Sequence, residues 1–161
     1  VAVLGDGKLG LLISQVLHAR GLRVHQFGRH REKLRIAGAA GVQTHVAGAK
    51  LPKAAYDWIV EATGSPQGLA DAVRMCRPRG TVILKSTTHG AAPFDTAPVI
   101  VQEISLVGSR CGRFEPALEL LQGRVINVKD MISGRLTLSQ APQAFERAAL
   151  RGVLKVLLEP D

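Results

Sequence analysis

The feature that most constrains this chain is a glycine-rich turn near its start, Gly5-Asp-Gly-Lys-Leu-Gly10, which directly follows the apolar run Val1 to Leu4. A short apolar run that ends in glycine is typical of a strand buried on both faces of a parallel sheet. Apolar residues at spacings of three and four predict an amphipathic helix over residues 9–19, which Gly21 is placed to end. The sequence therefore predicts a strand, a tight turn and a helix at the start of the chain.

Strands and helices are predicted to alternate over most of the remaining sequence. We expect strands at 23–27, 42–46, 56–62, 81–84 and 103–107, and helices at 31–39 and from a Ser65 cap with Pro66 to just before Pro78. The fold class is α/β, a Rossmann-type doubly wound parallel six-stranded sheet in the order 3-2-1-4-5-6. A strand-helix-strand tail follows, with strands at 136–138 and 153–158 and a helix capped by Ser139. The tail is interpreted either as an addition to the sheet edge or as a segment that packs on another domain. The 161 residues suit a single domain.

The glycine turn has the spacing of a phosphate cradle. Gly5 permits the tight turn, Gly7 lets the backbone approach a pyrophosphate, and Gly10 lets the helix pack closely on the strand. The amides of the first helical turn, with Lys8 and Leu9, then face the phosphates with a partial positive charge. We expect a dinucleotide here, and the alternative is a purely structural turn.

The end of the second predicted strand indicates which dinucleotide binds. An NAD site has a carboxylate there that accepts both ribose hydroxyls, but this chain has Gly28, followed by Arg29, His30 and Arg31. Glycine leaves room for a 2′-phosphate, and the arginines supply charge-assisted hydrogen bonds to it. We therefore expect NADP(H), with NAD(H) less favoured; the alternative is a solvated loop whose arginines touch only water.

Composition and spacing exclude several other classes. The net charge of +8 raises the question of nucleic acid, but one Trp, one Tyr and four Phe argue against a stacking platform. No apolar run is long enough to span a membrane, and no metal site can be drawn from the spacing of the Cys and His residues. Cys76 and Cys111 are interpreted as core residues and suit a reducing cytoplasm. Tyr56 lacks the lysine four residues later that a short-chain dehydrogenase needs, and a methyltransferase would want an acid where Gly28 stands.

Several motifs occur in the order and at the distances found in one known family. They are 3–10, Asp57-Trp-Ile-Val-Glu-Ala-Thr-Gly64, 80–87, 107–110 and 154–157. With them the chain resembles the C-terminal, cofactor-binding part of medium-chain dehydrogenases/reductases, the zinc-type alcohol dehydrogenase and threonine dehydrogenase group. The resemblance implies that the ends of the fourth and fifth strands line the nicotinamide ribose, that Lys33 lies on the adenosine side and that Lys155 reaches the pyrophosphate. The residues at those two strand ends are Ala62, Thr63, Gly64, Lys85, Ser86 and Thr87.

The resemblance also implies what lies outside this sequence. The family's catalytic zinc and proton relay belong to an N-terminal domain, so we assign no catalytic and no metal-binding residue here. The tail, about 127–161, is expected to pack on that domain, and the chain alone is expected to be inactive. In the whole protein we expect hydride transfer between NADP(H) and an alcohol or carbonyl substrate, with pairing of subunits through the edge Ile104 to Gly108. The alternatives are a non-catalytic NADPH-binding sensor and, less favoured, a nucleic-acid-binding protein.

Overall fold

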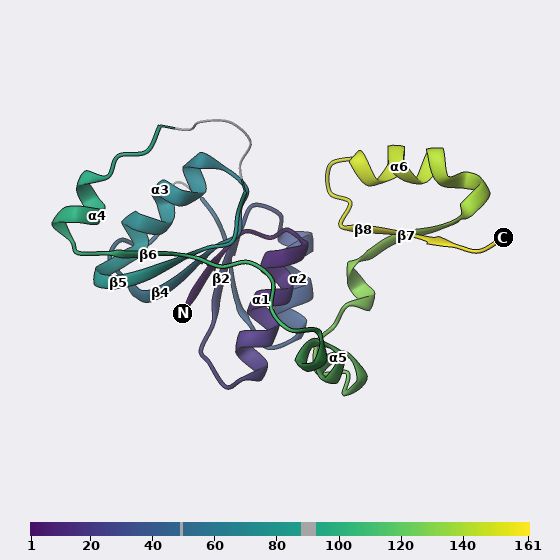
Figure 1. The fold of residues 1–161 in the computed structure, drawn as a ribbon, viewed down its shortest axis with the longest axis horizontal. Coiled ribbons are helices and arrows are strands. Elements are labelled where there is room, and N and C mark those ends of the chain that lie inside the picture. The colour runs from purple at the N-terminus through teal and green to yellow at the C-terminus, as the bar shows by residue number, and fades with distance from the viewer. Residues whose placement is uncertain (49, 88–92) are drawn as a thin grey trace.

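The computed structural model describes residues 1–48, 50–87 and 93–161. Its centre is a six-stranded sheet in the order β3-β2-β1-β4-β5-β6, in which every pair of neighbouring strands is parallel (Figure 1). This fold class and this strand order confirm the prediction. The strands are β1 Ala2–Leu4, β2 His25–Gly28, β3 Gln43–Val46, β4 Tyr56–Glu61, β5 Cys76–Leu84 and β6 Ser105–Gly108.

Helices cover both faces of the sheet (Figure 1). α1 and α2 pack on one face, where they share a core with Val3 and Val60, and α3 packs on the other. β1 is buried throughout, as expected for a central strand with helices on both sides. The helices of this part are α1 Lys8–Ala19, α2 Arg31–Ala39, α3 Pro66–Met75, α4 Ala97–Val101 and α5 Phe114–Gln122.

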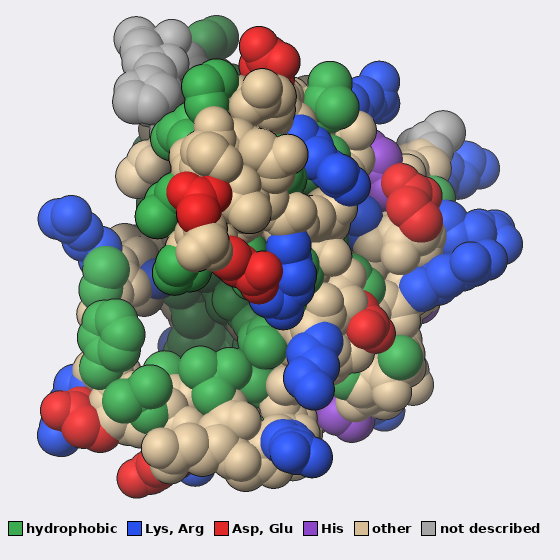
Figure 2. Space-filling view, turned by 90° about the vertical axis from the view of Figure 1, so that its right-hand side faces the viewer, with side chains coloured by type: hydrophobic (Ala, Val, Ile, Leu, Met, Phe, Trp, Pro, Cys, Tyr) green, Lys and Arg blue, Asp and Glu red, His purple; other side chains and the backbone are tan. Residues whose placement is uncertain are grey.

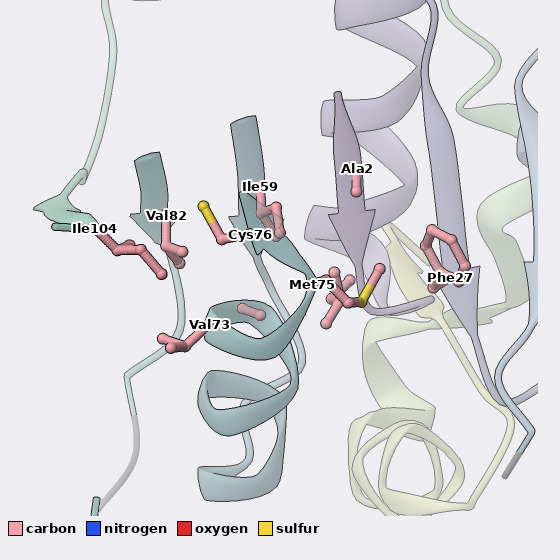
Figure 3. Packing of buried hydrophobic residues seen from close by; sticks show 10 residues of the cluster. Ala2, Phe27, Ile59, Val73, Met75, Cys76, Val82 and Ile104 are labelled. Atoms are coloured by element: carbon pink, nitrogen blue, oxygen red, sulfur yellow. The ribbon is translucent and has the colours of Figure 1, made fainter. Parts of the chain in front are cut away.

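The core on the α3 side places Met75, Cys76 and Val73 against Ile59 and Val82 (Figure 3). Burial, followed by the charge of Asp57, raises the pKa of the Cys76 thiol, so this cysteine is a packing residue, as predicted. The same interpretation of Cys111 is wrong, because Cys111 is exposed.

Several predicted boundaries are confirmed and several are wrong. The helix at 31–39 is confirmed, as is the Ser65 cap, whose Oγ accepts a hydrogen bond from the Gly68 amide at 3.1 Å. α3 ends at Met75, and β5 begins at Cys76 rather than at Thr81, with an irregular register beside Pro78, which has no amide to donate. β6 begins at Ser105 rather than at 103, because Glu103 turns with a φ of +51°. The prediction missed α4 and α5.

The tail forms a second, two-stranded parallel sheet that stands apart from the first (Figure 1). Its elements are β7 Ile132–Thr137, α6 Ala141–Ala149 and β8 Lys155–Glu159. The tail is therefore no addition to the six-stranded sheet. The capping box at the start of this helical stretch is made by Thr137 with Gln140, so the predicted Ser139 cap is wrong. Among the described residues, no helix has the length and apolarity needed to cross a bilayer.

The base of the tail is fixed to the main domain at two places. Met131 and Leu154 are buried in the same core cluster as Val3. Gln15 of α1 exchanges two hydrogen bonds with the backbone of Asn127, at 2.7 and 3.2 Å. The position of the tail is therefore set by α1 and its core.

Candidate functional site

A cleft of about 330 Å³ opens at the carboxyl ends of β1, β2 and β4, where ligands bind in open α/β sheets. It brings together eight of the residues that the sequence predicted, drawn from three separate parts of the chain. These eight are Gly5, Gly7, Gly28, Arg29, His30, Lys33, Ala62 and Thr63. The other lining residues include Asp6, Ser65, Gly68 and Asp71, none of which was predicted.

The glycine turn at the floor of this cleft is close-packed on two of its glycines and open at the third. A Cβ on Gly5, whose φ is +115°, would lie 2.4 Å from the carbonyl oxygen of Ala62. A Cβ on Gly10 would lie 2.3 Å from the carbonyl oxygen of Gly5. A Cβ on Gly7, at the start of α1, would meet nothing within 4 Å. The amides of α1 therefore begin at an open surface, which suits an anion.

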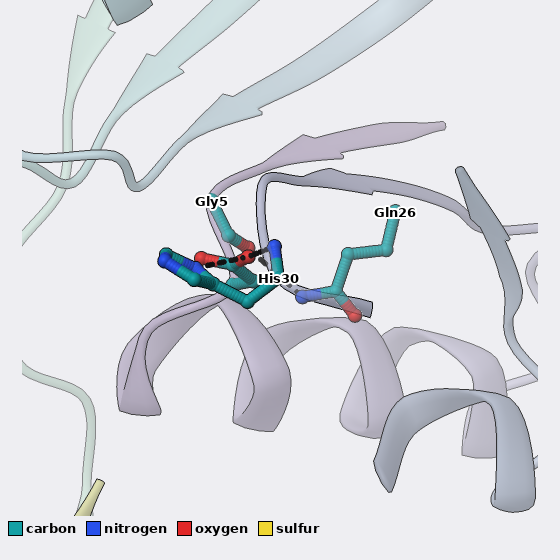
Figure 4. A network of polar contacts seen from close by, with 4 residues as sticks. Gly5, Gln26 and His30 are labelled. Carbon is teal, nitrogen blue, oxygen red and sulfur yellow. Dashed lines mark hydrogen bonds and ion pairs between the residues drawn. The ribbon is translucent and has the colours of Figure 1, made fainter. Parts of the chain in front are cut away.

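A buried hydrogen-bond network ties the turn to β2 (Figure 4). Gln26 Nε2 donates to the carbonyl oxygen of Gly5 at 2.9 Å, and the hydroxyl of Ser14 donates to Gln26 Oε1 at 2.7 Å. Both side chains are fully buried, so each polar atom depends on these partners. The sequence analysis missed this network, although a glutamine inside a strand predicted to be buried, Gln26, was a signal of it.

The space beside Gly28 is occupied by a carboxylate. A Cβ on Gly28 would lie 2.5 Å from Asp6 Cβ and 2.7 Å from Asp6 Oδ2. Oδ2 of Asp6 accepts hydrogen bonds from the backbone amide of His30 at 2.6 Å and from its ring Nδ1 at 3.0 Å (Figure 4). The interpretation that Gly28 leaves this position open is therefore wrong, because the glycine turn itself fills it. The sequence signal for this carboxylate was the acidic residue between Gly5 and Gly7.

The basic residues after Gly28 divide between two surfaces. Arg29 and Lys33 line the cleft. Arg31, the first residue of α2, lines a different hollow between α2 and β3. Lys8 and Leu9 are exposed on the first turn of α1, outside the residues that line the cleft.

The ends of β4 and β5 form a second polar cluster. Glu61 is buried, and its Oε1 accepts hydrogen bonds from the amide and the hydroxyl of Thr63, at 2.7 and 2.5 Å. Ser86 accepts a hydrogen bond from the Gly64 amide at 2.8 Å, so the two strand ends are joined. An acid that ended an apolar run was the signal for Glu61 in the sequence.

The remaining predicted residues lie outside the cleft lining. Gly64, Lys85, Ser86 and Thr87 lie at the same strand ends, where Lys85 Nζ donates to the carbonyl oxygen of Arg110. Lys155 is exposed at the start of β8 and borders a hollow against α6. Within the described part of the chain, no group of three or more His, Cys, Asp or Glu side chains is arranged to hold a metal ion.

Comparison with known families and structures identifies the relatives of this chain. The family described as "Zinc-binding dehydrogenase" matches residues 9–123, more than half of the sequence. The chain belongs to this family. It corresponds to the family's C-terminal NAD(P)-binding Rossmann domain, which confirms the resemblance inferred from the motifs.

Individual relatives agree with the assignment. A sorbitol dehydrogenase of Halalkalibacterium halodurans is 26% identical over 99% of this chain and 51% of its own length. A zinc-binding dehydrogenase of Sinorhizobium meliloti 1021 bound to NADP superposes with a TM-score of 0.87 and 26% identity, over 99% of this chain and 52% of that one. An alcohol dehydrogenase of Escherichia coli CFT073 complexed with NADH gives 0.82 and 21%, over 98% and 51%. The chain thus spans about half the length of the relatives it matches.

The residues of the cleft fit a dinucleotide. The surface at Gly7 is open to a pyrophosphate, and Arg29 and Lys33 face a ligand with cationic groups. His30 Nε2 is a buried nitrogen without a hydrogen-bond partner among the described residues, and such atoms are rare unless a ligand or water meets them.

Proposed function

We propose that this chain is the cofactor-binding domain of a zinc-type alcohol or polyol dehydrogenase that prefers NADP(H) to NAD(H). The observation that carries the preference is the pair of cationic side chains, Arg29 and Lys33, on the cleft wall next to the end of β2. A 2′-phosphate offers acceptor oxygens to both, and charge-assisted hydrogen bonds are the strong ones. One relative is bound to NADP and another to NADH, so the proposed preference rests on the residues of this chain and not on the relatives.

The residues have separate roles in this proposal. The turn from Gly5 to Gly10, with the first amides of α1, holds the pyrophosphate. Ala62, Thr63 and the joined ends of β4 and β5 support the nicotinamide end, and Lys155 reaches the pyrophosphate from the tail. The bound nicotinamide supplies hydride transfer to or from the substrate. The chain's own contribution is position and cofactor choice, with the substrate-binding and zinc-binding residues in the rest of the protein.

Titration of the chain with NADPH and NADH, followed by nicotinamide fluorescence, tests this proposal. We expect NADPH to bind more tightly than NADH. Arg29→Ala should lower NADPH affinity about tenfold or more and change NADH affinity little, because one charge-assisted hydrogen bond is worth about 1.5–3 kcal/mol. Arg31→Ala is the matched control, since Arg31 lies on another surface and should lower NADPH affinity less. Equal losses for both cofactors in Arg29→Ala contradict the NADP assignment.

A sensor would bind NADPH just as well, so binding alone does not separate it from an enzyme. Alcohol-dependent formation of NADPH by the protein that includes the zinc-binding half separates them, and its absence favours the sensor. Pairing through Ile104 to Gly108 and a cytoplasmic location remain part of this proposal. Leu106 and Val107, which are partly exposed on the edge strand β6, are the residues to change in a test of pairing.

A further inference from the structure

We infer that Asp6 and His30 together read the group at the 2′ position of the cofactor ribose, and that binding of a 2′-phosphate brings a proton onto His30. This inference rests on the proposed function and adds to it the pair of residues that discriminates between the two cofactors. Asp6 serves as a positioning residue, and His30 is the residue that contacts the ribose substituent.

The hydrogen bonds of Asp6 determine which ring nitrogen of His30 is free. Oδ2 of Asp6 meets both the backbone amide of His30, at 2.6 Å, and its Nδ1, at 3.0 Å. An ionised carboxylate only accepts hydrogen bonds, so Nδ1 carries a hydrogen in this arrangement. Nε2 is then the nitrogen whose protonation is free to change.

Nε2 is also the atom that lacks a partner. It is buried and makes no hydrogen bond with any residue in the described ranges, although the His30 side chain as a whole is 24% exposed and lines the cleft. A buried nitrogen without a partner is unfavourable, and a hydrogen bond from a ligand in the cleft would relieve it. His30 therefore gains from a cofactor group that reaches Nε2.

The pair lies where this fold carries its ribose-binding acid. In an NAD site the carboxylate comes from the end of the second strand. In this chain that residue is Gly28, and its missing Cβ would lie 2.5 Å from Asp6 Cβ. The carboxylate thus reaches the same place from the glycine turn, but it is engaged by His30 instead of being free for two hydroxyls.

The chemistry of Nε2 then distinguishes the two cofactors. A neutral His30 offers a lone pair at Nε2 and accepts a hydrogen bond from a 2′-hydroxyl. A dianionic 2′-phosphate offers only acceptor oxygens, so it needs a hydrogen on Nε2, and one proton moves from solvent to that atom. The other charged groups that line the cleft are Arg29, Lys33 and Asp71. Asp6 and Asp71 are the acids on this wall, and Arg29 and Lys33 are its bases.

Calorimetry of the full chain counts this proton. NADP⁺ and NAD⁺ are titrated at pH 8 in two buffers of different ionisation enthalpy, because a 2′-phosphate is almost fully dianionic at that pH. We expect binding of NADP⁺ to take up about 0.5–1 proton, because its 2′-phosphate needs a hydrogen on Nε2, and binding of NAD⁺ about 0–0.1, because its 2′-hydroxyl donates to the Nε2 lone pair. The affinity for NADP⁺ should fall by up to about tenfold per pH unit above this pH, as linkage of one proton requires.

Two variants identify the residues responsible. His30→Gln should abolish the proton uptake and lower NADP⁺ affinity about tenfold at pH 7, leaving NAD⁺ affinity within about threefold. Asp6→Asn keeps a carbonyl acceptor for Nδ1 but removes the negative charge beside the ring, so NADP⁺ affinity should fall about fivefold and by more than NAD⁺ affinity. Thermal unfolding of each variant shows that it is folded.

The possible outcomes separate this inference from the proposed function. Binding of NADP⁺ without proton uptake overturns the inference and leaves the proposed function standing. Uptake that persists in His30→Gln also overturns it, because another group then takes the proton. Failure of the unaltered chain to bind either cofactor overturns both. Proton uptake that is specific to NADP⁺ and lost in His30→Gln supports the inference. If Asp6→Asn does not fold, the proton count on the unaltered chain still tests the inference.

Discussion

The region around the glycine turn and the C-terminal tail differ in which side chains they bury and which they expose. Around the turn, Gln26, Ser14 and Asp6 are buried, and each is hydrogen-bonded within the chain. In the tail, large apolar side chains are exposed, with Phe145 at 73%. The end of the molecule that carries the tail shows hydrophobic side chains around a hollow (Figure 2). The buried polar side chains around the turn thus find their hydrogen-bond partners within this chain. The tail instead presents an exposed apolar surface of the kind that marks an interaction site.

This difference indicates where stability and cofactor recognition are concentrated. Close contacts at Gly5 and Gly10 leave no room for added atoms, because packed backbone cannot move aside cheaply. Changes on the exposed part of the tail meet only solvent in this chain. Substitutions in the two regions should therefore differ sharply in their effect on unfolding.

Gly10→Ala should have the largest effect, a loss of about 3 kcal/mol or more in the free energy of unfolding, since the new methyl group overlaps the carbonyl oxygen of Gly5. Denaturant unfolding measures it. Gly7→Ala is the matched control: its methyl group meets nothing within 4 Å, so stability should change by less than about 1 kcal/mol while NADPH affinity falls. If the two variants are equally stable, the conclusion that Gly10 packs closely against the carbonyl oxygen of Gly5 is wrong.

Leu154→Ala should come next, with a loss of about 2–5 kcal/mol, because Leu154 is buried in the core that contains Val3 and Leu11. Phe145→Ala, on the exposed side of α6, should change the free energy of unfolding by about 0.5 kcal/mol or less. Chemical unfolding of both variants divides the tail into an anchored base and an unsupported outer part. A large loss in Phe145→Ala would mean that the Phe145 side chain is packed in this chain.

Gly28→Ala should cost about 1–3 kcal/mol, because the added methyl group overlaps Asp6 and disturbs its bonds to His30. The double variant with Asp6→Gly removes the overlap, because the atom nearest to the added methyl group is Asp6 Cβ. Its loss should be smaller than the sum of the two single losses by about 1 kcal/mol, a coupling expected between groups in contact. Additive losses would show that Asp6 does not lie against Gly28.

The smallest effect concerns pH. Burial, then the charges of His45, the N-terminus and Arg23, lower the pKa of His25 below its usual 6.5. The unfolded chain therefore binds a proton more readily than the folded one, and the stability due to neutral His25 is lost as the pH falls through about 6.5 towards the lower folded pKa. His25→Gln should flatten the decline in melting temperature between pH 7 and 5. If the decline in melting temperature is the same in His25→Gln, other titrating groups cause it.

Local patterns predicted most of the fold. An apolar run that ended in glycine gave β1, and the alternation of strand-like and helix-like segments gave the other parallel strands. The spacing of apolar residues gave α1, and Ser65-Pro66 marked the start of α3. The elements that were missed or displaced depend on their surroundings. α4 is a single short turn, and β5 begins early because Cys76 pairs with Tyr56 before the register shifts.

The site divides in the same manner. The amino-acid sequence by itself determined the glycine turn, the cationic segment after Gly28 and the family, because each depends on residues that are close together in the chain. Only the tertiary structure decided that Arg29 and Arg31 belong to different surfaces, and that Asp6 fills the space beside Gly28. Asp6 and His30 are 24 residues apart, and their hydrogen bond exists because β1 and β2 lie side by side in the sheet and end at the same edge. A contact between the ends of neighbouring strands does not follow from the spacing of residues along the sequence, so it can be identified only once the sheet is assembled.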